Sequence, residues 1–140
     1  TGSQIDDIKK YYEDNKINFE LFTFRSNIKN IFKDVNLVIT RAGASALAEL
    51  ISANIPFISI PLQNSVDNHQ LENAKYYERN GCNFIINENE IDSKLFSLIK
   101  LVHEDKSLLS DIKRKQKNIV VSNIQKTLEK ELKKLINEKI

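Results

Sequence analysis

Apolar residues along the chain follow two patterns, short unbroken runs and stripes at helical spacing. The unbroken runs predict strands at residues 18–24, 37–40, 57–60 and 83–86. Residues 37–40 have the β-branched composition of a strand that is buried on both faces. Segments with helical periodicity separate these runs, so strands and helices alternate along the chain.

The helical stripes begin at residues that favour helix starts. In the first stripe, apolar positions recur every three or four residues from a cap at Ser3 to about Asn15. The expected starts of the later helices are Ser26 or Asn27, Gly43, Asp67 or Asn68, Asp92 or Ser93, Ser107, and Ser122, which opens a terminal helix at 122–140.

Two helix ends carry residues that tolerate a left-handed backbone. Asn54 follows the alanine-rich helix that starts after Gly43, at the position of a left-handed cap. Asn80-Gly81 follow the helix that carries Gln70. Both helices therefore have a predicted end as well as a predicted start.

The order of these elements predicts the fold class. It reads α-β-α-β-α-β-α-β-α-α, which is typical of an α/β fold with a doubly wound, parallel sheet. Such sheets bind ligands beyond the carboxyl ends of their strands. The turn at residues 41–45 and the polar loop before His69 both follow strands. We therefore expect a ligand site at that edge of the sheet.

Length and composition are those of an ordinary globular domain. The chain has 140 residues, of which 41% are hydrophobic and 29% charged, enough for one domain with its own core. No apolar run approaches the roughly 18 residues of a membrane span. The single cysteine, Cys82, cannot form an internal disulfide, which fits a reducing cytosol. Because the chain starts at Thr1 and contains no methionine, we expect it to be a piece of a longer protein.

Positive charge is concentrated towards the C-terminus. The net charge is +2, and residues 106–140 hold ten Lys and Arg against four acids. Such a segment is either a solvated helix face or a surface for an anionic membrane, a nucleic acid or an acidic partner. Interleaved acids and the lack of aromatic residues favour the solvated face, and no nucleic-acid partner is expected.

The turn Arg41-Ala42-Gly43-Ala44-Ser45 is the first candidate site. It joins the end of a strand to the start of a helix, where unpaired backbone N–H groups and the helix dipole favour an anion such as a diphosphate. Gly43 lets the backbone approach a ligand closely. The patterns G-x-G-x-x-G and G-x-x-x-x-G-K-[ST] are both missing, which argues against an NAD enzyme or a kinase.

Three polar side chains could complete such a site. Glu49 lies in an apolar segment, where a buried carboxylate needs partners such as two ribose hydroxyls; alternatively, it is the exposed edge of an amphipathic helix. Gln70 offers a donor and an acceptor for sugar hydroxyls. His69 either joins this group or is a helix-capping histidine. The other histidine, His103, is remote and no metal-ligand spacing exists, so no metal site is predicted.

Phe24 and Arg25 lie at the end of the predicted strand at 18–24, again at the ligand edge. An aromatic side chain there either packs in the core or packs against a nucleotide base.

Three motifs together resemble one glycosyltransferase family. They are R-A-G-A-S-A-L-A-E-L at 41–50, N-I-P-F-I-S-I-P-L at 54–62 and D-N-H-Q-L-E-N-A at 67–74. In combination and spacing they are similar to the C-terminal domain of the MurG family. Members of that family transfer GlcNAc from UDP-GlcNAc to a lipid-linked acceptor in peptidoglycan synthesis. The resemblance extends over nearly the whole chain.

The resemblance implies the Rossmann-like C-terminal half of a GT-B glycosyltransferase, an inverting enzyme that needs no metal and no cofactor. It implies that residues 1–140 bind the UDP-GlcNAc donor. The site residues that it implies are Gly43, Ala44 and Ser45 at the diphosphate, Glu49 at the ribose, His69 and Gln70 at the GlcNAc, and Phe24 with the backbone of Arg25 at the uracil.

By the same resemblance, the first strand of the donor domain and a whole N-terminal domain lie outside this chain. That N-terminal domain is expected to bind the lipid-linked acceptor and to supply the catalytic base, so the chain alone is expected to be inactive. The whole protein is expected at the cytoplasmic face of the inner membrane. Two other hypotheses are a stand-alone subunit, similar to that of the eukaryotic dolichol-linked GlcNAc transferase, and a non-enzymatic domain that binds an anionic surface through Lys113, Arg114 and Lys117.

Overall fold

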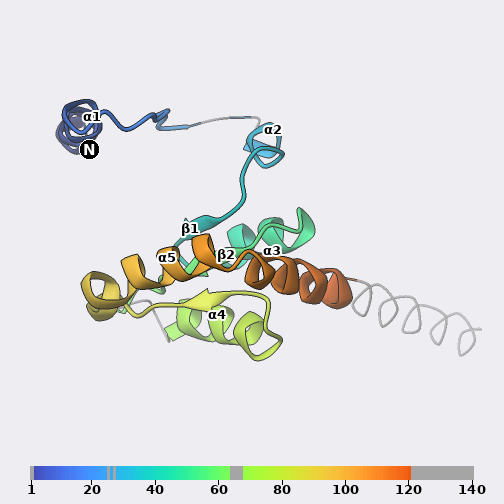
Figure 1. Cartoon of the computed structure of the whole chain (residues 1–140). Helices are drawn as coiled ribbons and strands as arrows, with labels where there is room; N and C mark the ends of the chain where they lie inside the picture. Colours follow the sequence, from blue (N-terminus) through green and yellow to red (C-terminus); the bar gives the residue numbers. More distant parts are fainter. Residues whose placement is uncertain (1, 25, 27, 64–67, 121–140) are drawn as a thin grey trace, which may run out of the picture. The chain divides into compact units, whose positions relative to one another are not determined.

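The computed structural model describes residues 2–24, 26, 28–63 and 68–120. They fall into two compact units, Thr1–Ile31 and Phe32–Ile140 (Figure 1). The sequence predictions that lie outside the described residues are the caps Asn27 and Asp67, the site residue Arg25, and the terminal helix at 122–140.

The N-terminal unit consists of helices and an irregular segment. Helix α1, Gly2–Asp14, confirms the first predicted helix, and α2 is a single turn, Ile28–Ile31. Residues 18–24 form no strand, so the prediction of a strand there is wrong. A strand needs a hydrogen-bonded neighbour, and the three strands that the structure describes all lie in the other unit. Phe19 instead packs on Tyr12 of α1, with ring centroids 5.1 Å apart.

A parallel sheet of three strands lies at the centre of the second unit. Strands β1 (Val38–Thr40), β2 (Phe57–Ser59) and β3 (Phe84–Ile85) are arranged in the order β1-β2-β3, with Ile39 opposite Ile58. The predicted α/β class with a parallel sheet is confirmed. Burial of β1 on both faces is wrong, because Ile39 is 47% exposed. Within the described residues β1 is an edge strand, with a neighbouring strand on one side only.

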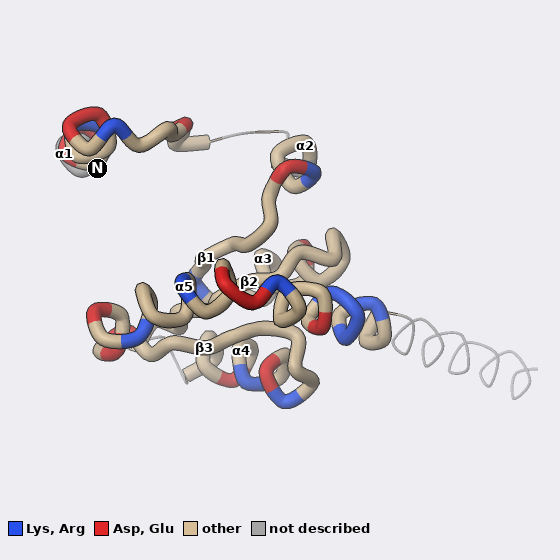
Figure 2. The backbone as a smooth tube through the Cα atoms, in the orientation of Figure 1, with Lys and Arg blue, Asp and Glu red and all other residues tan. Residues whose placement is uncertain are grey.

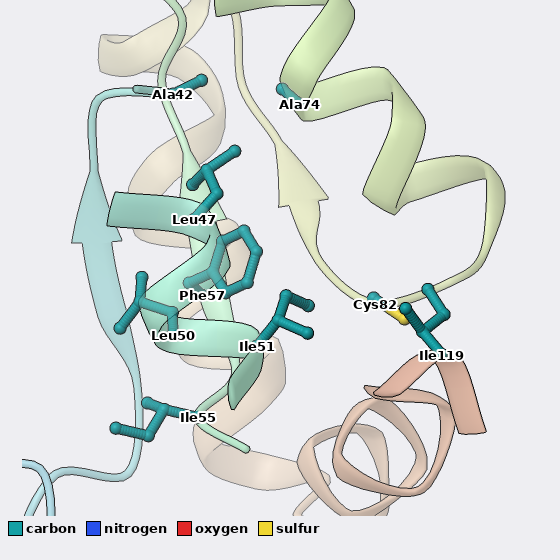
Figure 3. Packing of buried hydrophobic residues seen from close by; sticks show 9 residues of the cluster. All are labelled: Ala42, Leu47, Leu50, Ile51, Ile55, Phe57, Ala74, Cys82 and Ile119. Carbon is teal, nitrogen blue, oxygen red and sulfur yellow. The ribbon is translucent and has the colours of Figure 1, made fainter. Parts of the chain in front are cut away.

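One face of the sheet carries the larger buried cluster, which surrounds Phe57 (Figure 3). Its side chains include residues of α3 (Ala44–Ser52), of α4 (His69–Arg79) and of the helical residues 107–120. Leu47 of α3 and Phe57 are fully buried and close together. Burial of each such side chain contributes roughly 1.5–3 kcal/mol to folding.

The opposite face carries a second cluster around Ile58. Successive residues of a strand point to opposite faces, so Phe57 and Ile58 separate the two clusters. Partly buried side chains of the π-helical turn η3 (Ile91–Leu95) and of α5 (Phe96–Glu104) pack against the second cluster. Helices therefore cover both faces of the sheet, in agreement with the doubly wound architecture.

The two left-handed helix ends are confirmed. Asn54 has a φ of 56° after α3, and Gly81 has a φ of 66° after α4. The helix predicted from Ser107 is present at residues 107–120.

The side-chain caps at helix starts are predicted less well. Asn68 is at the cap position of α4 but makes no side-chain cap hydrogen bond. Asp92 and Ser93 are not caps, because the chain begins to turn earlier, at the 3₁₀ turn η2 (Glu88–Glu90). Asn87 forms a capping box there with the last residue of that turn.

Gln116 ties the helical residues 107–120 to two strand starts. Its side chain is fully buried, and its Nε2 group donates hydrogen bonds of 3.0 Å to the carbonyl oxygens of Ile55 and Cys82. Ile55 precedes β2 and Cys82 precedes β3, so one amide group fixes the amino ends of both strands to the helix. Nothing in the sequence marks Gln116 as buried, since it stands among lysines.

Gln116→Ala is expected to lower the free energy of unfolding by about 2–4 kcal/mol, because two buried carbonyl groups lose their donors. Lys117→Ala, at the exposed neighbouring position, is the matched control and should change it by less than about 0.5 kcal/mol. Urea unfolding followed by circular dichroism measures both variants. Equal effects of the two substitutions would contradict this role of Gln116.

Candidate functional site

Both candidate loops lie at the carboxyl edge of the sheet. Because β1 and β2 are parallel, the segments that follow Thr40 and Ser59 leave the sheet on the same side. The first segment leads through Gly43 into α3, and the second leads to His69 at the start of α4. The structure thus brings these two groups of predicted site residues to one edge.

The turn before α3 presents backbone N–H groups. Gly43 is the N-cap, with a φ of −67° and a ψ of 134°, and no side chain among the described residues caps this helix. The first N–H groups of α3, at Ala44 and Ser45, have no partner inside the helix and lie at the positive end of its dipole. A methyl group at Gly43 would meet no atom within 4 Å. Free donors, positive potential and open space are the properties that an anion site needs.

Glu49 lies on the exposed side of α3. Leu47, Leu50 and Ile51 are buried, whereas Ser45 and Glu49 are exposed. Of the two alternatives for Glu49, the structure therefore supports the exposed edge of an amphipathic helix and not the buried carboxylate, since the alanines that made this segment look apolar are exposed as well. Ser45 and Glu49 are four residues apart, so they share a face at a rise of about 6 Å along the axis. Within the described ranges no side chain pairs with the Glu49 carboxylate, so a ligand can reach it from solvent.

Gln70 is anchored to the loop after β2. Its Oε1 accepts a hydrogen bond of 3.0 Å from the backbone N–H of Leu62. Among the described residues nothing accepts a hydrogen bond from its Nε2 group, which is therefore oriented and available to donate to a ligand. His69, the first residue of α4, is exposed at the same helix end.

Asn73 links α4 to the turn; it stands in the third sequence motif, but no site role was predicted for it. Its Nδ2 donates a hydrogen bond of 3.2 Å to the carbonyl oxygen of Ala42. Ala42 is itself fully buried, so the residue before Gly43 is held through both its side chain and its carbonyl group. Its spacing could have indicated this role, because Asn73 follows Gln70 by about one helical turn and therefore lies on the same side of α4.

A second link that was missed joins the ends of the strands. Arg41 follows β1, and its Nη2 lies 2.7 Å from Oε1 of Glu88, which follows β3. Its Nη1 donates a hydrogen bond of 3.3 Å to the carbonyl oxygen of Ile60, which follows β2. The hydrogen bond from Arg41 lowers the pKa of Glu88, and a backbone hydrogen bond from Gln63 acts in the same direction. No local pattern predicts this contact, since its partners are 47 residues apart.

Phe24 and Arg25 belong to the N-terminal unit. Phe24 is 82% exposed, so its interpretation as a core residue is wrong in this unit. Arg25 lies outside the described residues. Their contact with a nucleotide base stays a prediction.

The described residues contain neither a metal-ligand cluster nor a membrane-spanning helix. No three His, Cys, Asp or Glu side chains converge in this part of the chain. None of its helices combines the length and the apolar character that crossing a bilayer requires. Cys82 is buried, and burial raises the pKa of its thiol, which makes it a poor nucleophile.

Comparison with known proteins identifies the family. Residues 1–136 match the family described as the glycosyltransferase family 28 C-terminal domain. The chain belongs to this family. The resemblance inferred from the three sequence motifs is thereby confirmed.

The relatives in the family are longer than this chain, which spans about a third of the length of the curated relatives it matches. It is 42% identical over 121 residues to the UDP-N-acetylglucosamine–N-acetylmuramyl-(pentapeptide) pyrophosphoryl-undecaprenol N-acetylglucosamine transferase of Pelagibacter ubique, covering 85% of this chain and 33% of that relative. The protein of the same name from Rickettsia bellii is 39% identical over 126 residues, covering 84% and 35%. The crystal structure of Acinetobacter baumannii MurG has a TM-score of 0.64 and 24% identity, over 79% of this chain and 34% of that one. This structural likeness confirms the Rossmann-like α/β fold.

Arg41→Ala is expected to raise the pKa of Glu88 towards the ordinary glutamate range, since the hydrogen bond that lowers it is lost. Any stability from the pair is fully present above the ordinary glutamate pKa and is lost as the pH falls through the lowered pKa. Carbon-detected NMR titration of the Glu88 carboxyl group measures the shift. Lys94→Ala, which removes the neighbouring pair with Glu90, is the control. An unchanged midpoint in Arg41→Ala would mean that the pair does not form in solution.

Proposed function

We propose that this chain is the donor-binding domain of a glycosyltransferase that moves GlcNAc from UDP-GlcNAc to a lipid-linked acceptor in peptidoglycan synthesis. The exposed face of α3 carries this proposal, because the N–H groups of Ala44 and Ser45, which have no partner inside the helix, lie about one helical turn from the exposed Glu49. Membership of the family and the names of the similar proteins support it.

The two ends of that face suit different parts of a nucleotide sugar. The N–H groups at the positive end of α3 bind the diphosphate and offset the charge that it gains on leaving. Open space at Gly43 lets the diphosphate approach the backbone closely. Glu49, one turn further along, accepts hydrogen bonds from both ribose hydroxyls.

Residues at the start of α4 bind the sugar. Gln70 donates from its Nε2 group to a GlcNAc hydroxyl, while the Leu62 N–H holds the other end of its amide. His69, beside it, contacts the same sugar. The contact of Phe24 and the backbone of Arg25 with the uracil stays a prediction from the resemblance.

The reaction is a direct displacement with inversion at the anomeric carbon of GlcNAc. An acceptor hydroxyl attacks this carbon, the bond to the diphosphate breaks, and UDP leaves with the electron pair. A general base takes the proton of the hydroxyl. We assign the base and the acceptor site to the part of the whole protein that corresponds to the unmatched two thirds of the relatives. That part also brings the enzyme to its lipid-linked acceptor at the cytoplasmic face of the membrane.

The alternative of a basic interaction domain has less support. Figure 2 shows the Lys and Arg positions of the helical residues 107–120 beside an acidic position. On the helical residues 107–120, Arg114 pairs with Asp111 at 2.9 Å. The Lys115 side chain lies over Gly81, where its Nζ would come within 2.7 Å of an added methyl group. Two of the basic residues of this helix are thus engaged inside the chain. The alternative of a stand-alone donor subunit differs only in how the acceptor domain is attached.

Glu49→Gln is expected to weaken UDP-GlcNAc binding by about tenfold to a hundredfold, because hydrogen bonds to a charged acceptor are replaced by weaker ones. Glu78→Gln removes an exposed carboxylate of α4 and should leave the affinity unchanged. Calorimetric titration of the complete gene product with UDP-GlcNAc measures both. The proposal fails if the unaltered protein binds no UDP-GlcNAc or if Glu49→Gln binds it equally well.

Gly43→Ala is expected to separate ligand binding from folding. The backbone at Gly43 suits any residue and the added methyl group meets no atom, so the free energy of unfolding should change by less than about 1 kcal/mol. The affinity for UDP should fall by about tenfold, since the methyl group occupies the approach to the backbone.

Gly81→Ala is the converse control for this experiment. Its φ of 66° and the overlap with Lys115 should cost about 1–2 kcal/mol of stability, with UDP affinity unchanged. Urea unfolding and UDP titration of both variants distinguish the two effects. Full UDP affinity in Gly43→Ala would argue against a diphosphate at this turn.

A further inference from the structure

We propose that, within the donor site proposed above, Arg41 and Glu88 are positioning residues that brace the turn at residues 43–45. They act through the backbone that precedes Gly43 and make no contact with the ligand.

Arg41 connects the carboxyl ends of all three described strands. It directly follows β1, and its Nη1 donates to the carbonyl oxygen of Ile60, directly after β2, at 3.3 Å. Its Nη2 lies 2.7 Å from Oε1 of Glu88, in the turn after β3. Glu88 in turn accepts a backbone hydrogen bond from Gln63, in the loop after β2. The pair therefore sets the relative positions of the strand ends at the edge where the donor binds.

The brace acts on the peptide just before the turn. Ala42 is fully buried in the cluster that contains α3, and its carbonyl oxygen accepts the hydrogen bond of 3.2 Å from Asn73. Arg41, one residue earlier, lies on the other side, where it lines a hollow of about 250 Å³ with Ile91 of the opposite cluster. The backbone that leads into Gly43 is thus held from both faces of the sheet.

Such a brace matters because this turn binds through its backbone. Backbone N–H groups cannot reorient one at a time, so their direction depends on how the whole turn is placed. Gly43 has no side chain and its surroundings are open to 4 Å, so the residues on either side of it must fix its position. The side chains of the Arg41–Glu88 pair are 50% and 34% exposed, and a pair this exposed contributes little to folding stability. We therefore expect the pair to affect the position of the turn and not the free energy of unfolding.

The first test needs no ligand. In amide NMR spectra of the complete gene product, Glu88→Gln should shift the resonance of Gly43, although the two residues are far apart in sequence. Lys94→Ala, which removes the adjacent pair with Glu90, should not shift it. If the Gly43 resonance does not shift in Glu88→Gln, the brace is overturned. This conclusion does not depend on which ligand the protein binds.

The second test compares the binding of UDP with that of uridine, which lacks the diphosphate. Arg41→Ala and Glu88→Gln should each weaken UDP binding by about threefold to tenfold and leave uridine binding unchanged. The affinity of the double variant for UDP should be no lower than that of the single variant with the lower affinity, since the two residues act as one unit. Lys94→Ala should change neither affinity.

The outcomes separate this inference from the donor site on which it rests. Equal weakening of UDP and uridine binding would indicate a general structural defect and overturn the positioning role, as would full UDP affinity in both single variants. If the unaltered protein binds no UDP, the donor site itself fails, and the Gly43 resonance still decides whether the brace exists.

Discussion

Burial of β2 on both faces is the constraint on which the rest of this structure depends. Phe57 and Ile58 point to opposite faces, and both are fully buried, so helices must cover both sides of the sheet. The chain meets this demand by returning through a helix after each strand, which makes neighbouring strands parallel. Parallel strands then place every segment that follows them at one edge. The position of the candidate site is therefore a consequence of how the central strand is packed.

The two edges of the sheet are secured by different means. At the amino edge, the buried amide of Gln116 binds the carbonyl groups that precede β2 and β3, in a site closed to solvent. At the carboxyl edge, partly exposed polar contacts hold the segments in place, and no side chain among the described residues caps the first N–H groups of α3. These contacts are Asn73 to Ala42, Gln70 to Leu62, and Arg41 to Ile60 and Glu88. A site that binds through its backbone needs this combination of fixed position and free donors.

Features with local causes could be predicted from the sequence. Three of the four strands were found because short apolar runs occur where a strand is packed, and the helix ends at Asn54 and Gly81 were found because left-handed φ is a preference of single residues. The family was found because its motifs are contiguous in sequence. The strand at 18–24 failed for the opposite reason, since a strand depends on a partner that local composition does not reveal.

The sequence by itself therefore determined the order of the elements between residues 37 and 120, the parallel α/β class and the residues proposed for the donor site. Only the tertiary structure decided that Glu49 is exposed, because alanine fits a buried and an exposed helix face equally well. Likewise, only the tertiary structure decided that Arg41 meets Glu88 and that Asn73 meets Ala42. These partners are distant in the chain, and they come together because the parallel sheet brings the ends of its strands to one edge.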